Sequence, residues 1–262
     1  METTTKKRGI NSNTLKIIAM AIMLIDHIGA VILERKLIFQ GIADVTEENA
    51  AAFLAQNSTL YWADFIMRNI GRIAFPIFLF LLFEGFRHTH DRRSYACRLA
   101  IFALISEIPF DLALTGKVFS LVKQSVGVTL LLVLLLFCLL DYLEQSSLPK
   151  MGIFVAQILS VAVFAVLGIL GRCDYGASGI LAAAAIYFFR KTRLMSMATG
   201  CLALSALSTA EIPAFLSLIP IHFYNGEKGK TQKYVFYAFY PVHLLLLYGI
   251  ACLLGLGGVA MF

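Results

Sequence analysis

The sequence has little charge. Only 15% of its 262 residues are Asp, Glu, Lys or Arg, whereas 59% are hydrophobic. A soluble domain usually has about 25% charged and about 45–50% apolar residues, and here the apolar excess runs along the whole chain. A bilayer core needs about 20 apolar residues per helical span. The composition argues against a separate soluble domain and predicts an all-α fold, a polytopic integral membrane helical bundle.

Several chemical signatures are also missing. No G-x-x-x-x-G-K phosphate loop occurs, which argues against ATP-driven chemistry. The five cysteines are scattered singly without a C-x-x-C pair, so neither a disulfide framework nor a zinc site is expected. The formal net charge of +6 comes mainly from short loops between apolar runs, as the positive-inside rule explains. We therefore expect a lipid bilayer around the protein and no nucleic-acid partner.

The apolar runs define the expected spans. The first follows Lys6, Lys7 and Arg8, as in a signal peptide, but it contains Asp26 and His27 and lacks a small-residue cleavage site. We expect it to remain as an uncleaved span. The seventh and eighth runs are short, and Pro213 and Pro220 fall in the eighth, so a re-entrant hairpin is the alternative to two full crossings. About nine spans are expected: 15–33, 65–86, 95–114, 125–143, 151–170, 176–190, 194–210, 211–224 and 234–257.

Basic residues fall mainly on one side when these spans alternate. The poorer side holds Arg35, Lys36, Lys117, Lys123 and Arg172, and the N-terminal tail shares the richer side with the loops around residues 87–98, 190–193 and 228–233. The positive-inside rule then places the N-terminus in the cytoplasm and the C-terminus outside the cell (cytoplasmic) membrane. The expected organisation is one domain over 1–262, with a cytoplasmic tail at 1–14 and an extracytoplasmic loop at 34–64.

Six ionisable residues of the expected spans lie at a similar depth. With a helical rise of about 1.5 Å per residue, they share a band from the midplane to the outer leaflet. Such residues are costly in hydrocarbon and usually functional, so we expect some of them to line one cavity. They are Asp26, His27, Arg72, Glu107, Asp111 and His243.

Each of these residues also has a structural interpretation. Arg72 would hold helices together by pairing with Asp26 or Glu107, and His243 would be a satisfied residue of the bundle. Glu107 and Asp111 lie four residues apart around Pro109, so they share a helix face and form a polar kink. Neighbouring helical residues point about 100° apart, so we expect Asp26 to pair with an arginine of another span and Glu107 to orient His27.

A second cluster lies on the predicted cytoplasmic side. The stretch FEGFRHTHDRRSYACR (83–98) has arginines whose planar guanidinium groups match phosphate oxygens. The structural alternative is a positive-inside loop that contacts anionic lipid. The spacing of His88 and His90 suits a metal, but no third ligand follows, so no metal is expected. The candidate cofactor-binding residues are Arg87, His88, Arg92, Arg93 and Arg98.

Four stretches, in this order and spacing, resemble the TraX family, whose namesake acetylates F pilin. They are LKIIAMAIMLIDHIGAVI, GRIAFPIFLFLLFEGFRHT, RLAIFALISEIPFDLAL and FYNGEKGKTQKYVFYAFYPVHLLLL, and they extend the resemblance from Leu15 to Leu247. Two departures lie on the acceptor side, namely a long 34–64 segment and Ser125 where the family pattern suggests Asn.

The resemblance implies an integral membrane acetyltransferase that uses acetyl-CoA. It implies a cytoplasmic donor, an extracytoplasmic acceptor such as a pilin-like peptide or an envelope glycan, and an intramembrane catalytic histidine, which His27 matches by motif position. In this hypothesis His27 is the general base or a transient acetyl carrier, with His243 as a second candidate base. Glu107 or Asp111 would orient His27 and bind an acceptor ammonium, and Arg72 would polarise the thioester oxygen.

Two other classes of function fit the intramembrane charges less well. A proton-coupled transporter would use Asp26, His27, Glu107 and Asp111 as a relay, but transporters often contain internal repeats and none is visible. A purely structural assembly factor would not need so many charges at one depth.

Overall fold

The structure is a computed structural model, and it describes residues 9–229 and 233–261. Residues 1–8, most of the predicted N-terminal tail, and the basic residue Lys230 lie outside the described part. The described chain is helical, with two isolated β-bridges and no strand. The helices in chain order are α1 (Ser12–Ile28), the π-helical η1 (Gly29–Glu34), α2 (Arg35–Phe39), the 3₁₀ helix η2 (Ile42–Asp44), α3 (Ala50–Gly71), α4 (Ala74–His88), α5 (Arg92–Thr115), α6 (Val126–Glu144), α7 (Lys150–Leu170), α8 (Gly176–Phe188), α9 (Arg193–Leu207), the 3₁₀ helix η3 (Thr209–Ser217), α10 (Leu218–His222) and α11 (Lys233–Leu253).

Five helical stretches among the described residues are long and apolar enough to cross a membrane. The sequence-based count of nine spans is therefore not confirmed. The predicted span 95–114 falls within α5, which does not qualify, and α8 and α9 are shorter apolar helices. The region 194–224 forms α9 followed by η3 and α10, which pack back against α9, as expected for a short hairpin. The five qualifying stretches are Ser12–Phe39, Ala50–His88, Val126–Glu144, Lys150–Leu170 and Val235–Leu253.

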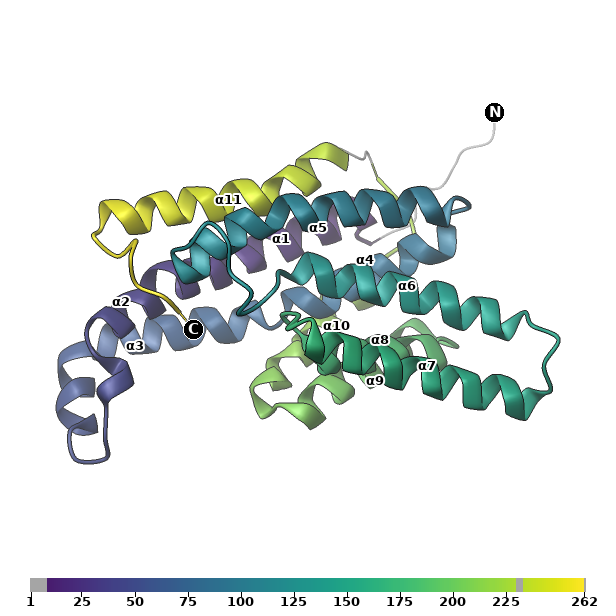
Figure 1. The fold of residues 1–262 in the computed structure, drawn as a ribbon, viewed down its shortest axis with the longest axis horizontal. Coiled ribbons are helices and arrows are strands. Elements are labelled where there is room, and N and C mark those ends of the chain that lie inside the picture. The colour runs from purple at the N-terminus through teal and green to yellow at the C-terminus, as the bar shows by residue number, and fades with distance from the viewer. Residues whose placement is uncertain (1–8, 230–232, 262) are drawn as a thin grey trace.

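The segment predicted as a loop at 34–64 is mostly helical. α2 ends at Phe39, and α3 begins at Ala50 after the polar stretch that contains Glu47 and Glu48. Together α3 and α4 form an apolar stretch of 39 residues, interrupted only at Arg72 and Ile73. At about 1.5 Å per residue this stretch exceeds the roughly 30 Å of a bilayer core, so part of it must extend beyond the hydrocarbon. Figure 1 shows α2 and the start of α3 projecting at one end of the molecule.

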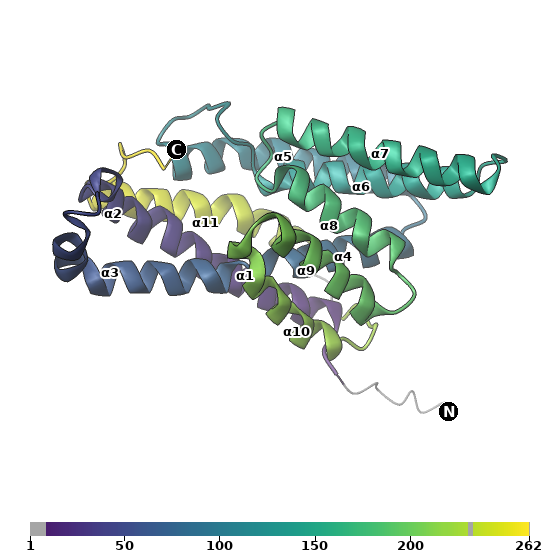
Figure 2. The same ribbon diagram turned by 90° about the horizontal axis from the view of Figure 1, so that it is seen from below.

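The opposite end of the molecule gathers the basic connections. There the segment before α1 pairs with the end of α10, where the Ile10 backbone N–H donates to the Phe223 carbonyl oxygen at 2.9 Å. The connections α4–α5, α6–α7 and α8–α9 lie at this same end in Figures 1 and 2. These three connections and the segment before α1 therefore share one end of the bundle. That this end faces the cytoplasm stays a prediction of the positive-inside rule.

Two apolar clusters hold the bundle together. The larger one surrounds α8, whose Ile180, Ala183 and Ile186 are fully buried, and it includes residues of α4, α6 and α9. The smaller one joins η1, the end of α5 and α11. By contrast, α7 presents most of its apolar side chains outward, as a lipid-facing helix does. The polar residues described next lie where these clusters meet, along α1, α3 and α11.

Candidate active site

Two histidines from the first and last long helices meet inside the bundle. His27 lies on α1 and His243 on α11, and the His27 Nδ1 and His243 Nε2 atoms are 2.6 Å apart. The ring planes are nearly parallel, at 13°, and the rings meet edge to edge with their centroids 4.9 Å apart, while Tyr240 packs edge-on against both. His243 is buried, whereas His27 keeps partial exposure. The pair therefore joins a partly buried imidazole on α1 to a buried one on α11.

Asp26 pairs with an arginine of another helix, as the sequence predicts. The partner is Arg68 on α3, whose Nη1 donates to Asp26 Oδ1. Arg68 Nε also lies 3.2 Å from Glu34 Oε2, so this guanidinium is held between two carboxylates. The π-helical turn η1 separates Asp26 from Glu34, and such turns are frequently found at functional sites. Arg68 is a site residue that the sequence analysis left out, although an arginine in an apolar span was a signal for it.

A glycine on α3 allows this close approach. A Cβ atom at Gly71 would lie 2.2 Å from Asp26 Oδ1, which is far inside contact distance. We expect Gly71→Ala to push Asp26 away from Arg68 and to cost about 1–3 kcal/mol of stability, as overpacked sites do. Thermal unfolding in detergent, compared with Gly249→Ala, which meets nothing within 4 Å, measures this effect. Equal unfolding temperatures for the two variants would contradict the close packing of α1 on α3.

Arg72 has a partner that the sequence did not suggest. Its Nη1 donates to Glu211 Oε1 at 2.9 Å, and Glu211 comes from η3, far along the chain. The expected pairing of Arg72 with Asp26 or Glu107 is therefore wrong, although Asp26 lies within electrostatic range. Tyr175, stacked on Phe75 at 3.5 Å between ring centroids, lies within electrostatic range of the same charges.

Glu107 and Asp111 lie one turn apart on α5, but their carboxylates bind residues of the 116–125 connection and not the histidines. Glu107 Oε1 accepts from the Ser125 hydroxyl at 2.6 Å and from the Ser125 backbone N–H at 3.1 Å. Asp111 Oδ2 accepts from the Ser120 backbone N–H at 2.8 Å. Both carboxylates therefore fasten the 116–125 connection, and the expectation that Glu107 orients His27 is wrong. Helix α5 also continues through Pro109.

The predicted cofactor-binding residues separate into two groups. Arg87 and Arg92 line a cavity of about 190 Å³ at the basic end, together with Tyr187 of α8 and Arg190, which follows α8. Acidic groups balance these charges, since Arg92 Nη1 lies 2.6 Å from Asp141 Oδ2 and Arg190 Nη2 binds both oxygens of Glu144. The remaining predicted residues, His88, Arg93 and Arg98, do not line this cavity. His88 lies 3.7 Å from Glu84, and Arg98 lies over the Tyr95 ring.

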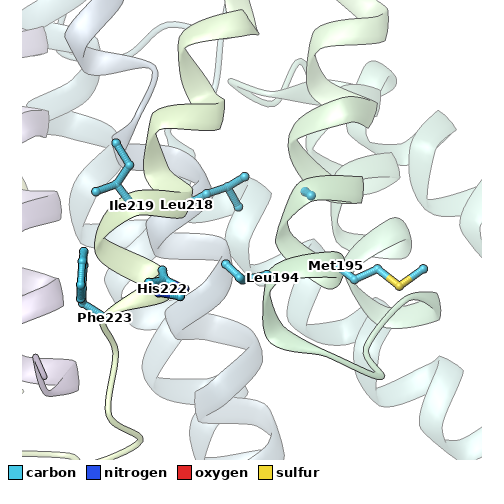
Figure 3. Close-up of a pocket in the computed structure, with 7 residues that line it drawn as sticks. Leu194, Met195, Leu218, Ile219, His222 and Phe223 are labelled. Atoms are coloured by element: carbon cyan, nitrogen blue, oxygen red, sulfur yellow. The ribbon is translucent and has the colours of Figure 1, made fainter. Parts of the chain in front are cut away.

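A larger, apolar groove lies on the flank of the bundle. It has a volume of about 580 Å³ and runs between α9 and α10, as Figure 3 shows. Its only ionisable lining group is His222, and it includes neither His27 nor His243. This groove therefore takes no part in the polar site described above. Its labelled side chains are Leu194, Met195, Leu218, Ile219, His222 and Phe223.

Comparisons with known proteins agree with the four stretches identified in the sequence. The family model described as TraX protein matches residues 11–251. A curated relative, the probable fimbrial assembly protein FimC, serogroup H1, of Dichelobacter nodosus, is 28% identical over 231 residues, which cover 79% of this chain and 90% of the relative. No solved structure matches this chain significantly. The match to the family model includes α1 with His27 and the part of α11 that carries His243, and the chain therefore belongs to the TraX family.

Proposed function

We propose that this multi-pass membrane protein is an acetyltransferase of the cytoplasmic membrane. It would move an acetyl group from cytoplasmic acetyl-CoA to an amine or hydroxyl of an extracytoplasmic acceptor. A pilin-like N-terminus or an envelope glycan is the proposed acceptor class. The observation that carries the proposal is the partly exposed His27 imidazole, held at 2.6 Å from His243 inside a helical bundle.

The proposed reaction needs only one base at the reacting atoms. His27 takes a proton from the acceptor amine while the nitrogen attacks the thioester carbonyl carbon. The carbon–sulfur bond then breaks, an amide is formed, and the CoA thiolate leaves with the proton from His27. A hydroxyl acceptor follows the same steps and yields an ester. The guanidinium of Arg72, beside Asp26 in the fold, is proposed to stabilise the negative charge on the carbonyl oxygen.

The donor is proposed to bind at the basic end. The cavity there combines Arg87, Arg92 and Arg190, a set suited to phosphate groups. His27 lies fifteen residues after Ser12, the first residue of α1 at that end, which is about 22 Å of helical rise. An extended pantetheine arm has a comparable length. No metal is proposed for this chemistry.

Two observations bear on the proposal, one on the acceptor and one on the transporter alternative. The family relation and the fimbrial assembly relative support a pilin-like acceptor. The transporter alternative gains no support, because Glu107 and Asp111 bind Ser125 and Ser120 rather than continuing a relay from His27. Without that link, a continuous path of carboxylates from His27 is missing among the described residues.

The test of the proposal is acetyl-CoA turnover by the purified protein in nanodiscs. A peptide with a free N-terminal amine serves as the acceptor probe, and free CoA thiol and acetylated peptide are measured together. The proposal predicts equal amounts of the two products. A protein that neither binds CoA nor releases thiol, yet carries solute along a pH gradient in proteoliposomes, would be a transporter instead.

The basic cavity makes a separate prediction about CoA affinity. Arg92→Gln should weaken CoA binding about 10- to 100-fold, because hydrogen bonds to charged groups contribute about 1.5–3 kcal/mol. The matched control is Arg93→Gln, which removes the neighbouring exposed arginine that does not line the cavity. Equilibrium binding of CoA to the two variants in nanodiscs measures the difference. Equal losses of affinity would point to general charge attraction rather than to this cavity.

A further inference from the structure

The histidine pair continues into a chain of hydrogen bonds with a defined direction. His243 Nδ1 lies 2.6 Å from the Phe239 carbonyl oxygen, one helical turn earlier on α11. A carbonyl oxygen only accepts hydrogen bonds, so the Nδ1 atom of His243 carries the proton. In a neutral imidazole the other nitrogen is then an acceptor. The Nε2 atom of His243 therefore accepts from the atom 2.6 Å away, which is His27 Nδ1.

The same logic fixes the state of His27. Because its Nδ1 donates to His243, the Nε2 atom of neutral His27 has a free lone pair. His27 is also the less buried residue of the pair by surface area, so the free nitrogen belongs to the residue that we propose as the base. Asp26 does not fix the tautomer of His27, since its carboxylate is bound to Arg68.

We infer that His243 is a positioning residue, which holds His27 in the Nδ1-protonated tautomer so that Nε2 acts as the base. This inference rests on the proposed function for its catalytic consequence, but the tautomer itself does not depend on it. It assigns to a second imidazole the role that a carboxylate has in serine proteases. It also replaces the view of His243 as a second base.

The packing around His243 supports this role. The ring lies between Phe239, at 4.6 Å and 18°, and His27, at 4.9 Å and 13°, with Tyr240 edge-on. Phe239 against one face and the edge-on Tyr240 restrict rotation of the ring, so its two nitrogens stay aligned with the Phe239 carbonyl and with His27. Asp26 adjoins His27 on α1, and charges from other elements also act on His27, namely those of Arg68 on α3 and Asp174 before α8. Neither has a hydrogen bond to the His27 ring among the described contacts.

Two substitutions of His243 separate positioning from mere packing. His243→Gln can place an amide oxygen near the position of Nε2 and still accept from His27. His243→Phe keeps an aromatic ring and removes the acceptor. The full-length protein is labelled with ¹⁵N-histidine in nanodiscs, and the ring nitrogens of His27 are identified by their absence in His27→Gln.

The expected spectrum shows His27 with a protonated Nδ1 and an unprotonated Nε2 in the wild type and in His243→Gln. In His243→Phe the tautomers should mix, and acetyl transfer should fall about 100-fold, within the range of general base catalysis. His243→Gln should retain transfer within about tenfold of the wild type, and CoA affinity should be the same in all three proteins. This pattern is not expected from a loss of packing alone, because Gln fills the ring's space less well than Phe.

Two results would overturn the inference. One is a wild-type His27 whose Nε2 carries the proton. The other is an unchanged His27 tautomer in His243→Phe. If the spectra agree with the inference but no acetyl transfer occurs in the wild type, the proposed function fails and the positioning of His27 stands. If transfer occurs but the spectra disagree with the inference, the proposed function stands and the positioning role of His243 fails.

Discussion

His27→Ala is expected to lower acetyl transfer by about 100- to 10,000-fold, which is the usual contribution of a positioned general base. The substitution removes the only imidazole of the pair that is partly exposed, and leaves the buried His243 without its partner. CoA affinity should stay within a factor of about two, because the proposed donor cavity lies at the basic end of the bundle. The measurement is the initial rate of acetylated-peptide formation, together with equilibrium binding of CoA.

The matched control for this variant is His222→Ala. His222 is exposed on α10 and lines the apolar groove shown in Figure 3, away from the histidine pair. Its removal should leave the rate unchanged. A His27→Ala protein that transfers acetyl groups at the wild-type rate would remove His27 from the reaction. A similar loss in both variants would indicate a general effect on the bundle.

The second large effect is expected on stability, at the ion pair between Arg72 and Glu211. The Glu211 side chain is only 8% exposed, whereas that of Arg72 is 30% exposed. Arg72→Ala leaves a buried carboxylate without its cation and should cost about 3 kcal/mol. By the scaling for soluble domains, this lowers the unfolding temperature by about 6–12 °C. Glu211→Ala should cost less, because the remaining guanidinium keeps access to water.

A double substitution tests the electrostatic origin of this effect. Adding Glu211→Gln to Arg72→Ala removes the unpaired charge, so most of the lost stability should return. Thermal unfolding of the three variants in the same detergent gives the comparison. A double variant that is less stable than Arg72→Ala would show that the pair contributes through packing and hydrogen bonds rather than through charge.

Hydropathy predicted the helical class and several helices well. The predicted spans 125–143 and 151–170 correspond to α6 (Val126–Glu144) and α7 (Lys150–Leu170). Both are bounded by polar connections and have no ionisable residue in their central parts, so the apolar window coincides with the helix. The prediction failed at α3, where a helix begins fifteen residues before the apolar run expected from Phe65. The first part of α3 includes Ala, Gln and Asn, so it is less apolar than a membrane span and hydropathy does not mark it.

The site was only partly predictable because depth along a helix does not give direction around it. The rise per residue placed Glu107, His27 and His243 in one band, but only packing of the helices decides which side chains face each other. His27 and His243 are 216 residues apart, and Arg72 and Glu211 are 139 residues apart. No local pattern links such positions. The Asp26 pairing was easier to predict, because a carboxylate in an apolar span requires a cation nearby.

The most direct test of the central claim is acetyl transfer across a sealed membrane. Proteoliposomes contain a peptide with a free N-terminal amine, and acetyl-CoA labelled in its acetyl group is added outside. Only molecules whose basic end faces outward can use this impermeant donor. The account predicts labelled peptide inside the vesicles and free CoA outside, with both products formed at least about 100-fold more slowly in His27→Ala vesicles. Label that stays on CoA in wild-type vesicles, despite bound CoA and enclosed peptide, would contradict it.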